Sequence, residues 1–232
     1  MNGSAEDNTA DGQNWATAPK VEAFGDRAVL VEWAIEGYSQ AASERALALA
    51  ARLASSPGGR FTEIVPGYAS VMAEFDPARE TLDTALESVR TMVKMTPDTP
   101  PAEGRRVEVP VRFGGSAGPD LGRICAASGL SEDEVITRYS GRDYRVCMMG
   151  FMPGFAFLSD VDPLIAHPRH ASPRARVPAG SVGIAGWQTG IYGLDSPGGW
   201  QIVGRTKLRT FDPARDPMFA LRAGDRVRFV PC

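Results

Sequence analysis

The chain has 232 residues, of which 43% are hydrophobic and 23% charged, and its formal net charge at pH 7 is -3. This composition is that of an ordinary globular protein and excludes collagen, coiled coils and wholesale disorder. No run of lysine and arginine offers a binding surface for phosphate backbones or anionic lipid, so nucleic acid and membrane surfaces are not expected partners. No apolar run reaches the ~18 to 20 residues that span a bilayer and no signal segment is evident, which predicts a cytoplasmic protein.

Residues 1–19 are rich in Asn, Asp, Gly, Ser and Ala and hold few side chains to bury, which predicts a disordered tail. The three cysteines, Cys125, Cys147 and Cys232, are odd in number and never form a Cys-x-x-Cys pair. They therefore predict neither a disulfide framework nor a zinc site, and we expect three thiols.

Between residues 20 and 100 the hydrophobic pattern changes period several times. Alternation predicts strands, an apolar face repeating every three to four residues predicts helices, and aspartate followed by proline is typical of a helix start. The expected elements are a strand at Ala28–Trp33, a helix at Ser39–Ala54, strands at Phe61–Val65 and Ser70–Phe75, a helix opened by Asp76 and Pro77, and a strand at Val107–Val111. This order predicts a small ferredoxin-like α+β domain over residues 20–100, with the last strand belonging either to its sheet or to the next domain.

Residues 101–232 predict a second, mostly β domain. Two short helices are expected at Asp120–Ala127 and Ser131–Tyr139, and Ser131 with Glu134 makes a capping box at the start of the second helix. Short strands are then expected at Tyr144–Met149, Val182–Ile184, Trp187–Tyr192, Trp200–Val203, Lys207–Phe211 and Arg226–Val230. Many short strands punctuated by glycine and proline are typical of a β-barrel or a β-sandwich.

The segment Gly150–Thr206 carries the residues best suited to chemistry. It contains Gly-Phe-Met-Pro-Gly-Phe at Gly150–Phe155, two Pro-Arg pairs ending in Arg169 and Arg174, and Ser-Pro-Gly-Gly-Trp at Ser196–Trp200. Glycine lets backbone N–H groups approach a ligand, proline fixes the loop shape, and arginine binds carboxylate or phosphate through its planar fork. Long loops of this kind are uncommon unless they bind or catalyse, so the segment predicts a site for a small anionic ligand.

These features also have a purely structural interpretation. The glycines and prolines serve turn geometry, and the arginines suit surface ion pairs with Asp160 or Asp162. Trp187, Tyr192 and Trp200 suit a hydrophobic core as well as a stacking platform. The sequence alone leaves both interpretations open.

Three familiar kinds of site are not predicted. His167 and His170 are the only histidines, and Pro168 between them argues against a helix that would hold both on one metal ion. Ser181 lies in Ala-Gly-Ser-Val-Gly, where alanine replaces the first glycine of a nucleophile elbow. The Gly-rich stretch Phe113–Gly118 lacks the lysine of a phosphate-binding loop, so a nucleotide would need an unconventional site or one largely on another chain.

Several motifs in the same order resemble one family. They are Gly25–Ala28, Val65–Tyr68, Gly115–Leu121, Gly150–Phe155, the two Pro-Arg pairs, Val177–Val182 and Ser196–Trp200. From about Gly25 to Phe229 the chain is similar to the B subunit of bacterial 5-oxoprolinase, a family also called allophanate hydrolase subunit 1 or Kip inhibitor. That family is homologous to part of the urea carboxylase carboxyltransferase domain, subdomain C and D.

The resemblance implies a small N-terminal α+β domain followed by a cyclophilin-like β-barrel. Two positions depart from the family pattern, since members often carry histidine where Tyr139 stands and proline where Gly193 stands. A role for that histidine is therefore not carried over to this chain.

The resemblance also implies an enzyme subunit that assembles with a paralogous C subunit and an A subunit and uses ATP to open the lactam of 5-oxoproline to glutamate. Phosphorylation of the lactam oxygen would create a leaving group before water attacks, and donors directed at the developing charge would assist. The candidate catalytic residues are Arg169, Arg174 and Tyr192. The candidate substrate-binding residues are Gly180 and Ser181 through their backbone N–H groups, Gln188, which orients the ring amide together with Tyr192, and Trp200 and Arg205.

Other functions stay open at this point. The family names also imply a subunit that acts on allophanate or urea, a carboxyltransferase component with a biotin-bearing partner, or an inhibitor that binds a sensor histidine kinase through an apolar patch. Prolyl isomerase activity would follow only from analogy with the barrel. No metal ion is expected.

Overall fold

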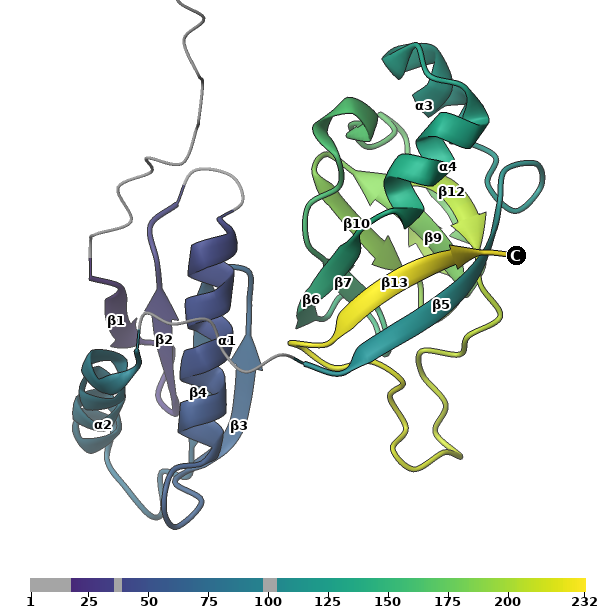
Figure 1. The fold of residues 1–232 in the computed structure, drawn as a ribbon. Coiled ribbons are helices and arrows are strands. Elements are labelled where there is room, and N and C mark those ends of the chain that lie inside the picture. Colours follow the sequence, from purple (N-terminus) through teal and green to yellow (C-terminus); the bar gives the residue numbers. More distant parts are fainter. Residues whose placement is uncertain (1–17, 36–38, 98–103) are drawn as a thin grey trace, which may run out of the picture.

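The computed structural model describes residues 18–35, 39–97 and 104–232, and these form two bodies, each built on its own β-structure (Figure 1). Two separate clusters of buried side chains form the core of the N-terminal body and the interior of the C-terminal body. The predicted tail lies almost entirely outside the described residues, and so does the predicted domain boundary near residue 100.

The N-terminal body is a four-stranded antiparallel sheet with two helices packed against it (Figure 1). Its elements are β1 (Lys20–Ala23), β2 (Ala28–Glu32), α1 (Gln40–Ala54), β3 (Phe61–Pro66), β4 (Ser70–Phe75) and α2 (Leu82–Met95). The strand order is β1-β2-β4-β3. Val29 and Val31 of β2 share a core with Leu49 and Leu53 of α1 and Val89 of α2, so the apolar periods in the sequence correctly identify the buried faces.

The ferredoxin-like arrangement predicted for this body is not confirmed. The expected last strand, Val107–Val111, lies within β5 (Arg106–Phe113) and pairs in parallel with β13 (Arg226–Pro231) of the other body. β1 lies beside β2 in place of the expected last strand. It is joined to β2 through a turn at Gly25, where φ is +70°. The hydrophobic pattern does not reveal β1 because none of its four residues is fully buried.

The second helix begins later than Asp76 and Pro77 predict. Its N-cap is Thr81, whose side chain accepts a hydrogen bond from the N–H of Thr84 at 3.3 Å. Asp76 instead accepts a hydrogen bond from the N–H of Ala78 at 2.9 Å within a turn. Aspartate side chains offer the backbone this local alternative to a helix, and here the turn forms in place of the first helical turn.

The C-terminal body is a closed β-barrel, which confirms the predicted barrel in outline. Around the barrel the strands are β10 (Gln188–Ile191), β7 (Ala156–Leu158), β6 (Asp143–Met149), β13, β5, β12 (Gln201–Arg205) and β9 (Ser181–Ala185). Val109, Val146, Val182 and Ile184 are among the side chains that fill its interior. The cyclophilin-like type of this barrel stays a prediction.

Helices α3 (Leu121–Ser128) and α4 (Glu132–Ser140) lie over one end of the barrel (Figure 1). The predicted capping box is present, since Ser131 and Glu134 each accept a hydrogen bond from the other's backbone N–H. Tyr139 of α4 reaches into the barrel, where its ring stacks on Phe229 at 5.0 Å between centroids and its hydroxyl bonds to Thr189. Tyr139 is therefore a core residue in this chain.

Several short segments differ from the expectation. The predicted strand Lys207–Phe211 belongs to a long loop between β12 and β13, where the N–H of Leu208 donates to the side chain of Thr206 rather than to a neighbouring strand. Strands β8 (Arg174–Val177) and β11 (Ser196–Gly198) pair with each other outside the barrel. A single turn of 3-10 helix, η1 (Pro163–Ile165), precedes them. Elements of three or four residues are too short to show a hydrophobic period.

The two bodies meet through a small number of side chains. The ring of Tyr68, in the turn between β3 and β4, lies edge-on to Trp187 at 5.1 Å between centroids, and its hydroxyl donates to the carbonyl of Leu158 at 3.4 Å. Arg145 of β6 pairs with Glu44 of α1 at 3.4 Å, and the arginine side chain is only 9% exposed. The β3–β4 turn and α1 therefore both contact the barrel.

The three cysteines carry thiols and form no disulfide with one another. Across the residues that the structure describes, no helix is both long enough and apolar enough to cross a bilayer. In the same part of the chain, no three side chains of His, Cys, Asp or Glu are grouped so that they could hold a metal ion.

Candidate functional site

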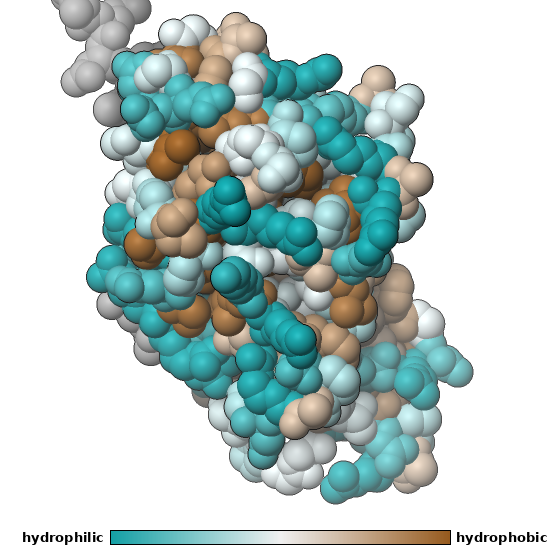
Figure 2. Space-filling view, turned by 90° about the vertical axis from the view of Figure 1, so that its right-hand side faces the viewer, coloured by the Kyte–Doolittle hydropathy of each residue, from teal (hydrophilic) through white to brown (hydrophobic). Residues whose placement is uncertain are grey.

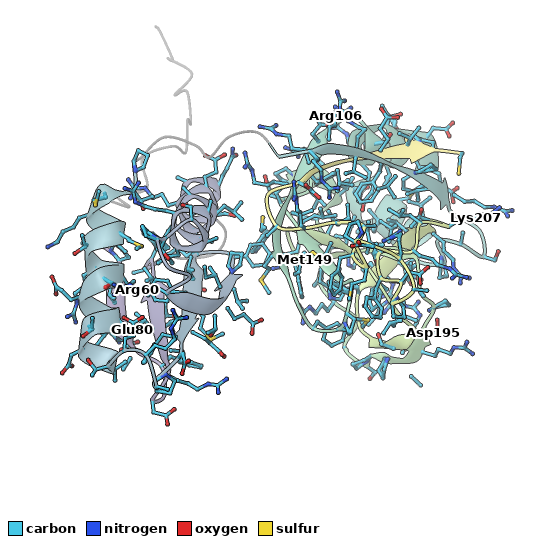
Figure 3. All side chains as sticks on the ribbon, turned by 90° about the horizontal axis from the view of Figure 1, so that it is seen from below. Arg60, Glu80, Arg106, Met149, Asp195 and Lys207 are labelled. Carbon is cyan, nitrogen blue, oxygen red and sulfur yellow. The ribbon has the colours of Figure 1, made fainter. Side chains whose placement is uncertain are left out.

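Two depressions on the described surface bear on the choice of a candidate site. One, of about 620 Å³, lies between α1 and α2, where Arg60 is already paired with Glu80 at 2.9 Å (Figure 3). The other, of about 440 Å³, lies on the C-terminal body and is built from the loops that the sequence singled out. Figure 2 shows the face of the molecule that lies on the right-hand side of Figure 1, where hydrophobic residues form separate patches among hydrophilic ones. We take the second depression, here called the barrel pocket, as the candidate site.

The walls of the barrel pocket come from segments far apart in the sequence. They are the Gly150–Phe155 loop, β7, the loop before β8, and the segment from Tyr192 to Trp200. Five aromatic side chains and one charged side chain dominate the lining: Phe151, Phe155, Phe157, Tyr192, Trp200 and Arg169. Three of the predicted site residues, Arg169, Tyr192 and Trp200, are thus brought together in one pocket.

The aromatic rings form an ordered floor. Phe155 contacts Phe157, Tyr192 and Trp200 at 4.6, 5.0 and 5.4 Å between centroids, and the last two contacts are edge-on. Tyr192 and Trp200 are both buried, in a small core outside the barrel interior. Edge-to-face contacts fix the orientation of each ring, so the floor is rigid before any ligand arrives. Tyr192 and Trp200 are therefore core residues that also face a pocket, whereas Trp187 packs against the N-terminal body.

Arg169 supplies the positive charge of the lining. Its guanidinium lies over the ring of Trp200, 5.7 Å from the centroid, which is a cation–π contact. The residue is exposed, and no carboxylate of the described residues forms an ion pair with it. The guanidinium can therefore bind an acid group of a ligand through its planar donors.

Tyr192 is a hydrogen-bond donor at neutral pH. Burial raises the pKa of its phenol to about 12, although a hydrogen bond from the N–H of Trp200 and the nearby Arg169 and Arg174 act in the opposite direction. The phenol therefore keeps its proton and can donate it in a hydrogen bond to a ligand oxygen, but it cannot serve as a base. Only glycine fits beside this hydroxyl at Gly198, since a Cβ there would lie 2.3 Å from it.

Arg174 lies behind the pocket wall rather than in the lining. Its guanidinium donates to Asp120 Oδ1 at 2.6 Å, and His170 Nε2 lies 3.2 Å from the same oxygen. Asp120 is 4% exposed and also accepts the N–H of Ile202 at 2.7 Å. Burial acts to raise the pKa of Asp120, but the hydrogen bonds from Arg174, Ile202 and His170 hold it below its usual value. Arg174 is therefore part of a partly buried network centred on the buried carboxylate of Asp120.

The ion pairs of this region differ from the pairs with Asp160 or Asp162 that the sequence suggested for its arginines. Arg176 pairs with Asp195 at the surface. Asp162 pairs with Arg138 of α4 at 2.8 Å. Arg169 is consequently the arginine of the Gly150–Thr206 segment that the fold directs to the pocket.

The backbone donors predicted at Gly180 and Ser181 are already engaged. The N–H of Gly180 donates to the carbonyl of Tyr192 at 2.8 Å, and the N–H of Ser181 donates to the carbonyl of Pro178 at 3.2 Å. Gly180 has a φ of +79°, and a Cβ there would lie 2.3 Å from the carbonyl oxygen of Thr206. The glycine is thus required by a tight turn, and both N–H groups are engaged within the fold. Their role in holding a ligand oxygen stays a prediction.

Gln188 and Arg205 also lie outside the pocket lining. Gln188 stands at the end of β10 away from Tyr192 and bonds to the side chain of Tyr68. Arg205 donates through Nε to the carbonyl of Ala179 at 3.1 Å. Their roles in substrate binding stay predictions.

Phe151, Phe155 and Phe157 are the aromatic pocket residues that sequence reasoning did not assign to a site. The Gly150–Phe155 motif is a signal for two of them, but phenylalanine in a β-rich segment is ordinarily a core residue. In the sequence, Asp120 indicates only the start of a helix. Its role in the network could not be predicted, because its partners Arg174 and Ile202 lie more than fifty residues further along the chain.

Comparison with known proteins identifies the family. Residues 19–221 match the family described as carboxyltransferase domain, subdomain C and D. The chain belongs to this family. All walls of the barrel pocket lie within the region that matches the carboxyltransferase domain family.

Individual relatives cover most of the chain. The 5-oxoprolinase B subunit of Escherichia coli O157:H7 is 42% identical over 209 residues, which cover 90% of this chain and 94% of the relative. The 5-oxoprolinase B subunit of Bacillus subtilis strain 168 is 38% identical over 221 residues, covering 91% and 92%. The crystal structure of TTHA0988 is similar at 40% identity and a TM-score of 0.76, over 89% of this chain. This chain spans 40% of the length of that solved chain.

Proposed function

We propose that this chain is a subunit of a 5-oxoprolinase that, with partner subunits and ATP, hydrolyses the lactam of 5-oxoproline to glutamate. One observation carries the proposal: two relatives named as the B subunit of 5-oxoprolinase are 42% and 38% identical to it over at least 90% of its length. The word subunit in those names supports activity in an assembled complex. We further propose that the chain is active only in that complex and that it lies in the cytoplasm.

The pocket suits a small ring that bears a carboxylate. Arg169 would bind the carboxylate through its planar donors. The phenol of Tyr192 would donate to the lactam carbonyl oxygen and so help to hold the lactam in place. Phe155 and Trp200 would cover the CH₂ groups of the ring, and the volume of about 440 Å³ lies in the range of small-molecule sites.

ATP would transfer a phosphoryl group to the lactam oxygen. Water would then add to the carbonyl carbon and the ring C–N bond would break, which leaves an acyl phosphate, and a second water would release phosphate and glutamate. A triphosphate needs several cationic or N–H donors, and the pocket has the one guanidinium of Arg169 among mainly apolar walls. The lining therefore fits a single carboxylate better than a triphosphate. We assign ATP to a site shared with, or provided by, the partner subunits, and we assign Arg174 to holding the pocket wall from behind.

The test combines this chain with its candidate A and C subunits and measures phosphate release from ATP and glutamate formation from 5-oxoproline. We expect turnover only in the full mixture. Arg169→Ala removes the partner of the substrate carboxylate, and a charged hydrogen bond of this kind corresponds to a loss of about 10- to 100-fold in kcat/KM. The matched control is Arg176→Ala, because Arg176 is an exposed arginine of β8 that pairs with Asp195 outside the pocket.

Two outcomes contradict the proposal. One is the absence of turnover in a mixture that has been shown to assemble, and the other is an equal effect of the two arginine substitutions. Allophanate and urea are tested as substrates in the same assay, since the family is that of a carboxyltransferase domain. If the complex turns over either compound instead of 5-oxoproline, that compound is the substrate that the pocket binds.

A further inference from the structure

Phe151 combines two features that do not occur together in any other residue of the pocket lining. Its side chain is 67% exposed, although it lines the barrel pocket. Its backbone has a φ of +65°, and among the residues described here it is the non-glycine residue with a positive φ. Such a conformation is uncommon for a bulky side chain and costs free energy. An exposed aromatic residue that holds this conformation calls for an explanation.

A three-residue turn holds Phe151 in this conformation. The N–H of Met152 donates to the carbonyl of Gly150 at 2.7 Å, which closes a γ-turn with Phe151 at its centre. A γ-turn with a positive central φ is rare and strained. Two more bonds, between the N–H of Gly150 and the carbonyl of Phe155 at 3.2 Å and between the N–H of Phe155 and the carbonyl of Met152 at 3.1 Å, tie the loop to itself.

Packing of the Phe151 ring does not offset the strain. The ring makes one edge contact, with Phe155 at 5.5 Å between centroids, and most of its surface faces solvent. The base of the loop is packed against the loop between β12 and β13, because a Cβ at Gly154 would lie 2.7 Å from the Cβ of Phe211. A firmly based loop with a strained tip thus presents an aromatic ring at the mouth of an aromatic pocket.

We propose that Phe151 is the closing wall of the barrel pocket and selects small anions that carry an apolar ring. The Phe151 ring folds onto the exposed face of the bound ring, Trp200 and Phe155 contact its other side, and Arg169 binds the acid group. Contact with the ligand supplies the burial that the ring lacks in the open state, so ligand binding shifts the loop toward closure. The inference rests on the proposed function for the identity of the natural ligand.

The first test compares substitutions at Phe151 with the same substitutions at Phe24. Phe24 is a matched control, because it is a 55% exposed phenylalanine next to the β1–β2 turn of the N-terminal body. In the assembled enzyme we expect Phe151→Ala to raise the KM for 5-oxoproline about tenfold with little change in kcat, and Phe151→Leu to raise it less. Phe24→Ala should leave both constants unchanged.

A second probe separates this inference from the proposed function. The fluorescent aromatic anion anilinonaphthalene sulfonate is titrated into this chain alone, and we expect Phe151→Ala to weaken its binding about tenfold. If the wild-type complex has no activity on 5-oxoproline, the proposed function fails while this result still supports the closing wall. Equal binding of the fluorescent anion by the wild type and Phe151→Ala would overturn the inference.

Thermal unfolding measures the backbone strain independently of any ligand. Glycine adopts a positive φ without penalty, whereas alanine does not, so Phe151→Gly should have a Tm about 2–4 °C above that of Phe151→Ala. At Phe24, whose φ is not positive, alanine should be the more stable of the two. If alanine is also the more stable residue at Phe151, the strained turn is absent and the closing mechanism is overturned.

Discussion

Tyr192 illustrates how its surroundings set the chemistry of a single side chain. A tyrosine phenol in water has a pKa of about 10. Burial raises the pKa of Tyr192 to about 12, and the N–H of Trp200, Arg169 and Arg174 offset this rise only in part. The hydroxyl is therefore protonated at neutral and mildly alkaline pH. It can donate a hydrogen bond to a carbonyl oxygen, but it cannot act as a base.

Tyr192→Phe tests this at the scale of one hydroxyl group. The variant keeps the ring in the aromatic floor and loses the donor, so we expect kcat/KM for 5-oxoproline to fall about tenfold. Titration of tyrosinate absorbance in both proteins should show a difference only as the pH approaches the value of about 12. A difference already complete near pH 10, or an unchanged kcat/KM, would contradict the assigned role.

Asp120 shows how one carboxylate holds several elements in place. It stands at the N-terminus of α3 and accepts hydrogen bonds from Ile202 of β12 and Arg174 of β8. The loop between η1 and β8, which carries Arg169, lies beside it, because His170 Nε2 is 3.2 Å from Asp120 Oδ1. The N–H of His170 also donates to the carbonyl of Gly199 at 2.7 Å. The position of the pocket wall therefore depends on a buried group that does not line the pocket.

Asp120→Asn is expected to loosen this arrangement. The amide keeps the size of the side chain but not the charge that Arg174 and His170 contact, so the free energy of unfolding at pH 7 should fall by about 1–3 kcal/mol. Because the folded-state pKa of Asp120 lies below its usual value of about 3.9, the stabilisation is complete above that value and is lost as the pH falls through the lowered pKa. Denaturant unfolding at pH 7 and at about pH 3 should therefore give a smaller difference between the two proteins in acid. A difference that grows on acidification would contradict this account.

At the scale of the whole molecule, the junction between the bodies reaches the pocket. Tyr68 of the N-terminal body contacts the Phe157 ring at 6.2 Å between centroids, and Phe157 lines the barrel pocket. On the other side of Phe157, its ring contacts Phe155 and Trp200. The N-terminal body thus supports the back of the pocket floor. The Val-Pro-Gly-Tyr motif, which ends in Tyr68, therefore has a structural role.

Tyr68→Ala and Tyr68→Phe separate the ring from the hydroxyl. Loss of the ring should lower the free energy of unfolding by about 2 kcal/mol, because aromatic contacts across the junction are lost. Loss of the hydroxyl alone should cost about 1 kcal/mol, less than loss of the ring, because it removes only the hydrogen bonds to Gln188 and to the Leu158 carbonyl, and the latter is long at 3.4 Å. Denaturant unfolding of the three proteins measures both effects. An equal loss in the two variants would mean that the hydroxyl, not the ring, holds the junction.

Much of the fold was predictable from local pattern. The capping box of Ser131 and Glu134, the strands around Val29 and Val71 and the first helix all follow from residues close together in the sequence. The helix start at Asp76 was predicted wrongly for an equally local reason, since an aspartate turn and a helix cap use the same residue type. Strand β1 lacks a pattern because little of it is buried.

Local pattern was enough to predict the elements with a strong apolar period, the strand-rich second half and the segment that holds the pocket. Three features became visible only in the folded chain: Val107–Val111 joins the barrel, Arg169 and Tyr192 line one pocket, and the N–H groups of Gly180 and Ser181 are engaged in a turn. The physical reason is that a hydrophobic period reports which face of an element is buried, whereas strand partners and pocket walls depend on contacts between residues distant in the chain. Several such contacts could use the same backbone and side-chain groups. Which of them form is settled only when the whole molecule packs.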